Sequence, residues 1–232
     1  MNIYALFALS FVPLLAVFVL FMIFVPGLKL RHALWACILG LITVAPASFI
    51  QYYVLNLPIF YTGTVISLLV TAVIFNGLIE ETVKMLFMAL QPQKKTILPA
   101  FFACSLLCGL TLGSFESVIY MMRRIQDTAY PLTSREIYNL IASRMFTAVL
   151  IHTFCAGLSG LYLWGFRHNS RHIMPFIWAV LLHGVYNFFA GFKSGFYWFA
   201  IIAIVFAALE CRIWYKFFNL PDTGVDVKPK IH

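Results

Sequence analysis

The sequence predicts an all-α fold, a polytopic transmembrane helical bundle with about seven (7–8) spans. The first observation is composition: 62% of the 232 residues are hydrophobic and 10% are charged, whereas about a quarter of the residues in a soluble domain are charged. The second is a series of apolar runs, each long enough to cross a ~30 Å hydrocarbon core at ~1.5 Å rise per residue. Such runs must be helical, because lipid offers the backbone no hydrogen-bond partner.

The first apolar run, residues 3–25, is expected to be a span rather than a cleavable signal sequence. It lacks a basic n-region and a small-residue cleavage site, and it is longer than the apolar part of a signal peptide. The other predicted spans lie at about residues 33–55, 62–90, 97–122, 144–166, 173–192 and 195–217.

One longer connection, residues 123–143, separates the fourth span from the fifth. Within it, Thr133 and Glu136 have the spacing of a capping box, so we expect a helix to begin there and to continue into the fifth span. The chain is therefore predicted to form one transmembrane domain, residues 1–218, followed by a polar C-terminal tail, residues 219–232.

The formal net charge of +8 does not indicate a nucleic-acid-binding protein, because the Lys and Arg residues lie in short loops rather than in a stripe or run. They indicate orientation in a lipid bilayer instead. With the N-terminus outside, the predicted cytoplasmic side holds ten basic residues: Lys29, Arg31, Lys94, Lys95, Arg167, Arg171, Arg212, Lys216, Lys228 and Lys230. The other side holds five: Arg123, Arg124, Arg135, Arg144 and Lys193. The positive-inside rule thus predicts a multi-pass protein of the cell membrane, N-out and C-in.

Acidic side chains inside the apolar runs are the first candidates for chemistry, since each costs ~2.5–3.5 kcal/mol at mid-bilayer and is rarely kept without a function. Glu80 and Glu81 are followed by Lys84, which lies on the helix face of Glu80. We therefore expect Lys84 to pair with Glu80 and to leave Glu81 facing water as a general base. The rival is that Lys84 orients Glu81 and Glu80 is the base, and the structural alternative is an ion pair that only joins two helices.

A second segment contains Gly109, Gly113 and Glu116. The two glycines form a small-xxx-small face, which allows a neighbouring helix to approach closely. Glu116 follows Gly113 by three residues, so we expect it at that contact. The alternative is a glutamate near the outer interface that points outward, where its burial costs less.

Two histidines, His152 and His183, also lie within predicted spans. His183 and Asn187 are four residues apart, so both can donate hydrogen bonds toward one point, as in an oxyanion hole. The alternative for each residue alone is a hydrogen-bonded contact between helices. Together, the carboxylates, imidazoles and carboxamide of four consecutive spans can activate a water molecule and stabilise a tetrahedral oxyanion, with or without a metal.

These segments resemble the PrsW family of intramembrane proteases, which is related to the type II CAAX prenyl endopeptidases and the CPBP proteins. The resemblance covers about residues 75–187, the expected catalytic core. It rests on Glu80-Glu81-x-x-Lys84, Gly113-x-x-Glu116-x-x-x-Tyr120, the span with His152, and His183-x-x-x-Asn187. Glu116 stands where the CAAX relatives usually carry a histidine. The resemblance implies an endopeptidase that cleaves membrane-protein or lipid-anchored peptide substrates, such as an anti-sigma factor.

Two mechanisms fit these residues. In the metal-free mechanism, which we favour slightly, a glutamate of the first motif is the general base, a histidine assists, and His183 with Asn187 holds the oxyanion. In the metalloprotease mechanism, Glu116, His152 and His183 bind zinc and a glutamate of the first motif is the base.

Two other classes of function remain as alternatives. A secondary transporter would also place ionisable residues at mid-membrane, but the sequence shows no inverted repeat and no paired broken helices. A non-catalytic membrane scaffold or immunity-type protein would have no need for the glutamate pair and the histidine–asparagine pair together.

Overall fold

The computed structural model describes residues 8–57, 64–92, 96–126, 132–192 and 195–220. These ranges contain helices and no strand, which confirms the predicted all-α fold for this part of the chain. The helices are α2 (Val12–Phe24), α3 (Leu30–Leu55), α4 (Val65–Val70), the π-helix η2 (Thr71–Gly77), α5 (Leu78–Met88), α6 (Leu98–Gln126), α7 (Ser134–Phe146), α8 (Ala148–Arg167), α9 (Met174–Ala190) and α10 (Tyr197–Asn219).

Each predicted apolar run contains a helix, but the predicted number of spans is not confirmed. Five helices of the described chain are long and apolar enough to cross a membrane. Two further apolar helices, Ala8–Phe24 and Met174–Ala190, are shorter. The predicted tail overlaps the last residue of α10 and then runs mostly outside the described residues.

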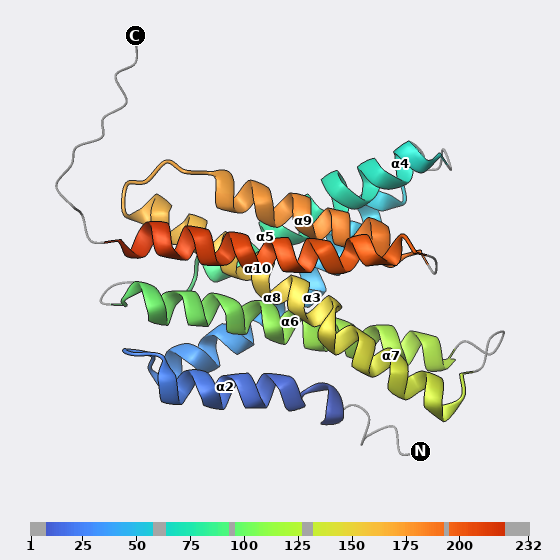
Figure 1. The fold of residues 1–232 in the computed structure, drawn as a ribbon, viewed down its shortest axis with the longest axis horizontal. Coiled ribbons are helices and arrows are strands. Elements are labelled where there is room, and N and C mark those ends of the chain that lie inside the picture. Colours follow the sequence, from blue (N-terminus) through green and yellow to red (C-terminus); the bar gives the residue numbers. More distant parts are fainter. Residues whose placement is uncertain (1–7, 58–63, 93–95, 127–131, 193–194, 221–232) are drawn as a thin grey trace, which may run out of the picture.

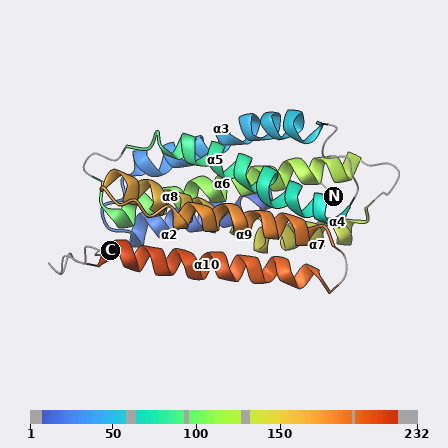
Figure 2. The ribbon, with the colours of Figure 1, turned by 90° about the horizontal axis from the view of Figure 1, so that it is seen from above.

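The helices form an antiparallel bundle in which successive spans run in opposite directions along its long axis (Figures 1 and 2). Helices α2, α5, α8 and α10 end, and α3, α6 and α9 begin, at one end of the bundle, here called the α8–α9 end. Helices α3, α6 and α9 end, and α4, α7 and α10 begin, at the other, here called the α6–α7 end. Helix α6 and the segment Ser134–Arg167, which comprises α7 and α8, are central, since 78% of the apolar window of each is buried, against 28% for α10. The outer helices therefore present apolar side chains to their surroundings.

Glycines allow two close helix crossings beside the site residues. A Cβ on Gly109 of α6 would lie 2.2 Å from the carbonyl oxygen of His152, and one on Gly113 would lie 2.9 Å from Val149 Cα. The predicted close contact at these glycines is confirmed, and the partner is the helix that carries His152.

The second crossing joins η2 to α9. A Cβ on Gly77 would lie 2.6 Å from the carbonyl oxygen of Val180, and one on Gly184 would lie 2.2 Å from Val73 Cα. Because Gly184 directly follows His183 and Gly77 lies three residues before Glu80, this crossing brings those two side chains to the same level of the bundle.

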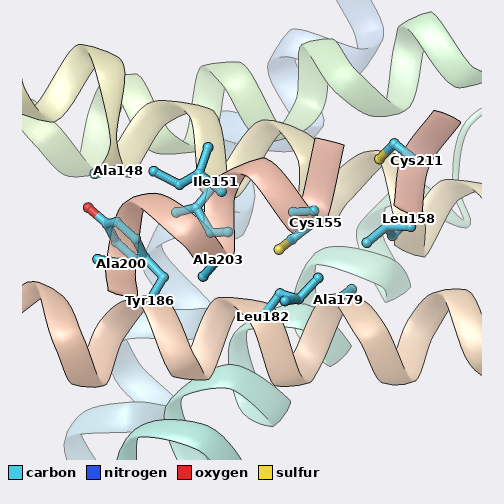
Figure 3. Close-up of a cluster of buried hydrophobic side chains, with 12 residues drawn as sticks. Ala148, Ile151, Cys155, Leu158, Ala179, Leu182, Tyr186, Ala200, Ala203 and Cys211 are labelled. Atoms are coloured by element: carbon cyan, nitrogen blue, oxygen red, sulfur yellow. The ribbon is translucent and has the colours of Figure 1, made fainter. Parts of the chain in front are cut away.

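An apolar cluster fixes the rotation of α8 and α9 behind the histidines (Figure 3). Its buried members are Ala148, Ile151, Cys155 and Leu158 of α8, Ala179, Leu182 and Tyr186 of α9, and Ala200, Ala203, Ile204, Ala207 and Cys211 of α10. Ile151 directly precedes His152, and Leu182 directly precedes His183. Since successive residues are about 100° apart on a helix, burial of the apolar neighbour against α10 turns each histidine away from the cluster.

Two predicted helices contain irregular backbone that the sequence did not indicate. The predicted span at residues 62–90 is divided into α4, the π-helix η2 and α5. The capping box is confirmed, since Thr133 N donates to Glu136 Oε2 (2.8 Å) and Glu136 N donates to Thr133 Oγ1 (3.3 Å). The helix that begins there continues into the fifth span as one apolar segment, Ser134–Arg167, in which Thr147 (φ −128°, ψ −76°) is an irregular residue between α7 and α8.

Candidate active site

Glu80, His152 and His183 converge at the centre of the bundle. One ligand atom from each of these three residues lies within 4.8 Å of the others, and all three residues are buried. Glu80 Oε1 is 2.8 Å from His152 Nδ1, and Glu80 Oε2 is 3.7 Å from His183 Nε2. In the described part of the chain, this is the group of His, Cys, Asp and Glu side chains that could hold a metal ion.

The facing atoms of this group have no hydrogen-bond partner among the described residues. They are Glu80 Oε1, His152 Nδ1 and His183 Nε2. Although Glu80 Oε1 and His152 Nδ1 are close, their geometry does not make a hydrogen bond. Buried polar atoms are almost always paired, and those that are not require an explanation, such as an ion or a water molecule. Three unpaired atoms around one point therefore mark a position for such a group.

The other ring nitrogen of His183 is held by a carboxylate. His183 Nδ1 lies 2.7 Å from Glu81 Oε1, and Glu81 is fully buried. Lys84 Nζ donates to the same carboxylate at 2.6 Å, and Ser159 Oγ donates to its second oxygen at 3.1 Å. We call Lys84, Glu81 and His183 the Lys84 arm.

The predicted pairing of Lys84 with Glu80 is present only as the longer of two contacts, and the predicted water-facing position of Glu81 is wrong. Lys84 Nζ is 3.9 Å from Glu80 Oε1 and makes its short contact with Glu81, whose side chain is 0% exposed, against 9% for Glu80. The i,i+3 contact is shorter than the i,i+4 contact because Glu81 also contacts His183 and Ser159, which lie on other helices. Glu80, rather than Glu81, is therefore the carboxylate nearer water.

His152 is held in the same way from another side. Its Nε2 lies 2.5 Å from Glu116 Oε2. Arg144 Nη2 donates to Glu116 Oε1 at 3.2 Å, and Arg144 Nε donates to Ser117 Oγ at 3.3 Å. The guanidinium of Arg144 also lies 4.2 Å from the ring centre of Tyr120. We call Arg144, Glu116 and His152 the Arg144 arm.

The predicted metal set of Glu116, His152 and His183 is not the set whose atoms face one another. Glu116 contacts Nε2 of His152. Glu80, in contrast, lies between the two rings, with one oxygen near His152 Nδ1 and the other near His183 Nε2. Two histidines and one carboxylate are a common ligand set for catalytic zinc. A second carboxylate on the far nitrogen of each ligating histidine is also typical of such sites. The residues present therefore fit a zinc ion held by Glu80, His152 and His183.

A cavity of about 380 Å³ opens beside this group. Its lining residues come from α3, η2, α5, α6 and α9 and are Val44, Ala47, Ser48, Gln51, Asn76, Glu80, Leu112, Glu116, Ile119, Tyr120, Arg123 and Asn187. Of the predicted site residues, Glu80, Glu116 and Asn187 line this site cavity, while Glu81, His152 and His183 lie behind its wall.

Sequence reasoning missed Asn76, Gln51, Ser159 and Arg144 as members of the site. Asn76 carried a usable signal, because it lies four residues before Glu80 and thus on the same helix face. Arg144 lies at the start of the fifth predicted apolar run, where a charged side chain is usually paired with an acidic group. Gln51 and Ser159 gave no such signal, since single polar residues also occur in spans as contacts between helices.

The family comparison gives one match. A model described as PrsW family intramembrane metalloprotease matches residues 29–209, which include every residue of the two arms and of the site cavity. The comparisons with curated proteins and with solved structures found no match.

Proposed function

Because the chain belongs to the PrsW family of intramembrane metalloproteases, we propose that it is a metal-dependent endopeptidase that hydrolyses peptide bonds of membrane-bound substrates. The observation that carries the proposal is the set of partnerless atoms on Glu80, His152 and His183 beside a polar cavity. Buried ligand atoms next to a cavity of about 380 Å³ leave room for both an ion and part of a peptide chain.

The metal site would be held by Glu80 Oε1, His152 Nδ1 and His183 Nε2. A zinc ion bound there supplies a water nucleophile near neutral pH and polarises the scissile carbonyl. The chain's own contribution is orientation. The Lys84 arm fixes the ring of His183, and the Arg144 arm fixes the ring of His152.

The substrate would enter from the α6–α7 end of the bundle. The site cavity includes Gln51 near the end of α3 and Arg123 near the end of α6, and both helices end on that side. The charge bias supports an orientation in which this is the outer side of the cell membrane, with the N-terminus out and the C-terminus in. A substrate anchored in the membrane with an outer segment, as the resemblance implies for an anti-sigma factor, would present its chain to this opening.

The test uses purified protein in liposomes and a library of quenched fluorescent peptides, each with one apolar span and a variable outer segment. We expect cleavage that is lost with Glu80→Gln and with removal of zinc by a chelator, and about one zinc per chain by elemental analysis. The matched control is Glu210→Gln, since Glu210 also lies in an apolar helix but contacts Trp214 of α10, away from the site.

Four results would contradict the proposal. Cleavage of no library peptide excludes the peptidase, and full cleavage by Glu80→Gln excludes this site. Cleavage that needs Glu80 but no metal would support the metal-free glutamate mechanism instead. Ion flux through the same liposomes, lost with Glu80→Gln, would support the secondary transporter.

A further inference from the structure

The site cavity contains two carboxamides, Asn76 of η2 and Asn187 of α9. Neither side chain makes a hydrogen bond or ion pair with another described residue, although both are half-buried inside a bundle of apolar helices. Polar side chains at membrane depth are costly and are typically paired or turned toward a functional cavity. These two groups are therefore available to whatever enters the cavity.

His183 is not available as the partner of Asn187 in an oxyanion hole. Its Nδ1 is held by Glu81, its Nε2 faces Glu80, and its side chain is fully buried behind the cavity wall. The pair expected from the sequence, His183 with Asn187, thus retains one accessible donor. An oxyanion hole usually has two or more donors aimed at one oxygen, so a second group must come from elsewhere in the cavity.

Asn76 is the other carboxamide that lines the cavity, and its place on η2–α5 fits a second donor. It is four residues before Glu80 on η2–α5, and Asn187 is four residues after His183 on α9. Because these helices are antiparallel (Figure 1), both residues lie about 6 Å along the bundle from Glu80 and His183, toward the α6–α7 end. Gly77 and Gly184, which lie next to these positions, allow the two helices to approach closely.

The helix that carries Asn76 is itself unusual. Seven residues of η2 form a π-helix, which is rare, occurs mostly as a single turn, and is found often at functional sites. Asn76 and Gly77 are its last two residues, so the wider turn ends directly at the crossing with α9. A functional contact of Asn76 accounts for a local geometry that regular helix packing does not require.

We propose that Asn76 and Asn187 together bind the oxygen of the scissile carbonyl as it becomes an oxyanion. This inference rests on the peptidase function proposed above. When water adds to the carbonyl carbon, a C–O bond forms and the C=O π electrons move to the oxygen, which then accepts the carboxamide N–H groups. When the C–N bond breaks, those electrons re-form the carbonyl, and a proton from the water goes to the leaving amine.

The test compares Asn76→Ala and Asn76→Asp with wild type on the best-cleaved peptide of the library. Loss of one oxyanion donor lowers kcat by roughly 10²–10³-fold, and we expect this for both variants with little change in KM. Asn76→Asp keeps the size of the side chain but replaces the donor with an acceptor, so it separates hydrogen bonding from packing. The matched control is Asn139→Ala, an exposed asparagine of α7 outside the cavity, which should cleave like wild type.

A second measurement separates this role from a structural one. Binding of the same peptide to Glu80→Gln protein should be equal with and without Asn76→Ala, because the contact forms only in the transition state. The inference is overturned if Asn76→Asp keeps its kcat, if the loss is in KM alone, or if peptide binding falls with Asn76→Ala. If wild type cleaves no peptide, or Glu80→Gln cleaves as fast as wild type, the proposed function fails first and the inference falls with it.

Discussion

In both His152 and His183, one ring nitrogen contacts a carboxylate and the other faces Glu80. The carboxylate is that of Glu116 for His152 and that of Glu81 for His183. Each of these carboxylates is held in turn by a cation, Lys84 for Glu81 and Arg144 for Glu116. The two arms differ in exposure: the Glu81 side chain is 0% exposed, and the Glu116 side chain is 42% exposed and lines the site cavity. The Arg144 arm therefore depends more on its cation to keep the carboxylate on the histidine.

Replacing Arg144 should weaken metal binding without unfolding the protein. In Arg144→Gln, Glu116 loses its charged partner and can turn into the cavity, so the ring of His152 is no longer fixed. Removal of such an outer partner typically costs about 10–100-fold in metal affinity. Competition with a chromogenic zinc chelator measures this, and Arg144→Lys should restore part of the affinity.

The control is Arg135→Gln, because Arg135 is an exposed arginine on the same helix, α7. It should bind zinc like wild type. Equal zinc affinities for Arg144→Gln and wild type would show that the Arg144 arm does not orient His152.

At the scale of single residues, the sequence predicted which side chains gather but not how they pair. Glu80, Glu81, Glu116, His152 and His183 all lie at one site, as expected from their cost inside apolar helices. The closer of the two partners of Lys84 was not predicted, since helix spacing permits either glutamate. That choice is made by His183 and Ser159 on distant helices, and no local pattern carries this information.

At the scale of helices, the crossings at glycine decide how closely the site residues approach. Apolar run length predicted where helices occur, and the small-xxx-small spacing predicted the crossing of α6 with α8. The π-helix η2 and the irregular backbone at Thr147 were not predicted. Both depend on neighbouring helices: η2 lies against α9 at Gly77 and Gly184, and Thr147 accepts a hydrogen bond from Tyr186.

Gly184→Ala should separate η2 from α9. The new Cβ would lie 2.2 Å from Val73 Cα, which is backbone and cannot turn aside. We expect a loss of about 1–3 kcal/mol in unfolding free energy, the usual cost of overpacking, together with weaker zinc binding because His183 moves from Glu80. Thermal unfolding in detergent and chelator competition measure the two effects.

Gly191→Ala is the matched control, because Gly191 directly follows α9, the helix that contains Gly184. Its new Cβ would meet the carbonyl oxygen of Phe188 at 3.6 Å, an ordinary contact, so both stability and zinc affinity should match wild type. A stable Gly184→Ala protein with normal zinc affinity would contradict the view that this crossing sets the site.

At the scale of the whole molecule, basic residues lie in two groups, one at each end of the bundle. Lys29, Arg31, Arg167 and Arg171 lie at the α8–α9 end, and Arg123, Arg124 and Arg135 lie at the α6–α7 end where the site cavity opens. Composition predicted a membrane bundle because only 10% of the residues are charged. This is too few for the water-facing surface of a soluble protein. The number of spans could not be predicted as well, since two apolar helices are shorter than a full crossing.

The proposed orientation can be tested by labelling in intact cells. Arg135→Cys should react with a membrane-impermeant maleimide, because the α6–α7 end is proposed to face outward. Arg171→Cys, in the α8–α9 connection, should react only after the membrane is permeabilised. The wild-type chain is the control for its own five cysteines. The reverse pattern would place the cavity opening on the cytoplasmic side.

The order of the helices divides the site into halves that could be made as separate chains. Glu80 and Glu116 precede the α6–α7 connection, and His152 and His183 follow it. Since membrane helices can insert independently and associate afterwards, a split protein with residues 1–126 and 132–232 on two polypeptides should reassemble by complementation. Neither fragment holds Glu80 together with His152 and His183, so only co-expressed halves should retain zinc on purification. Each half alone would then be an inactive precursor of the enzyme, because it lacks a complete metal site.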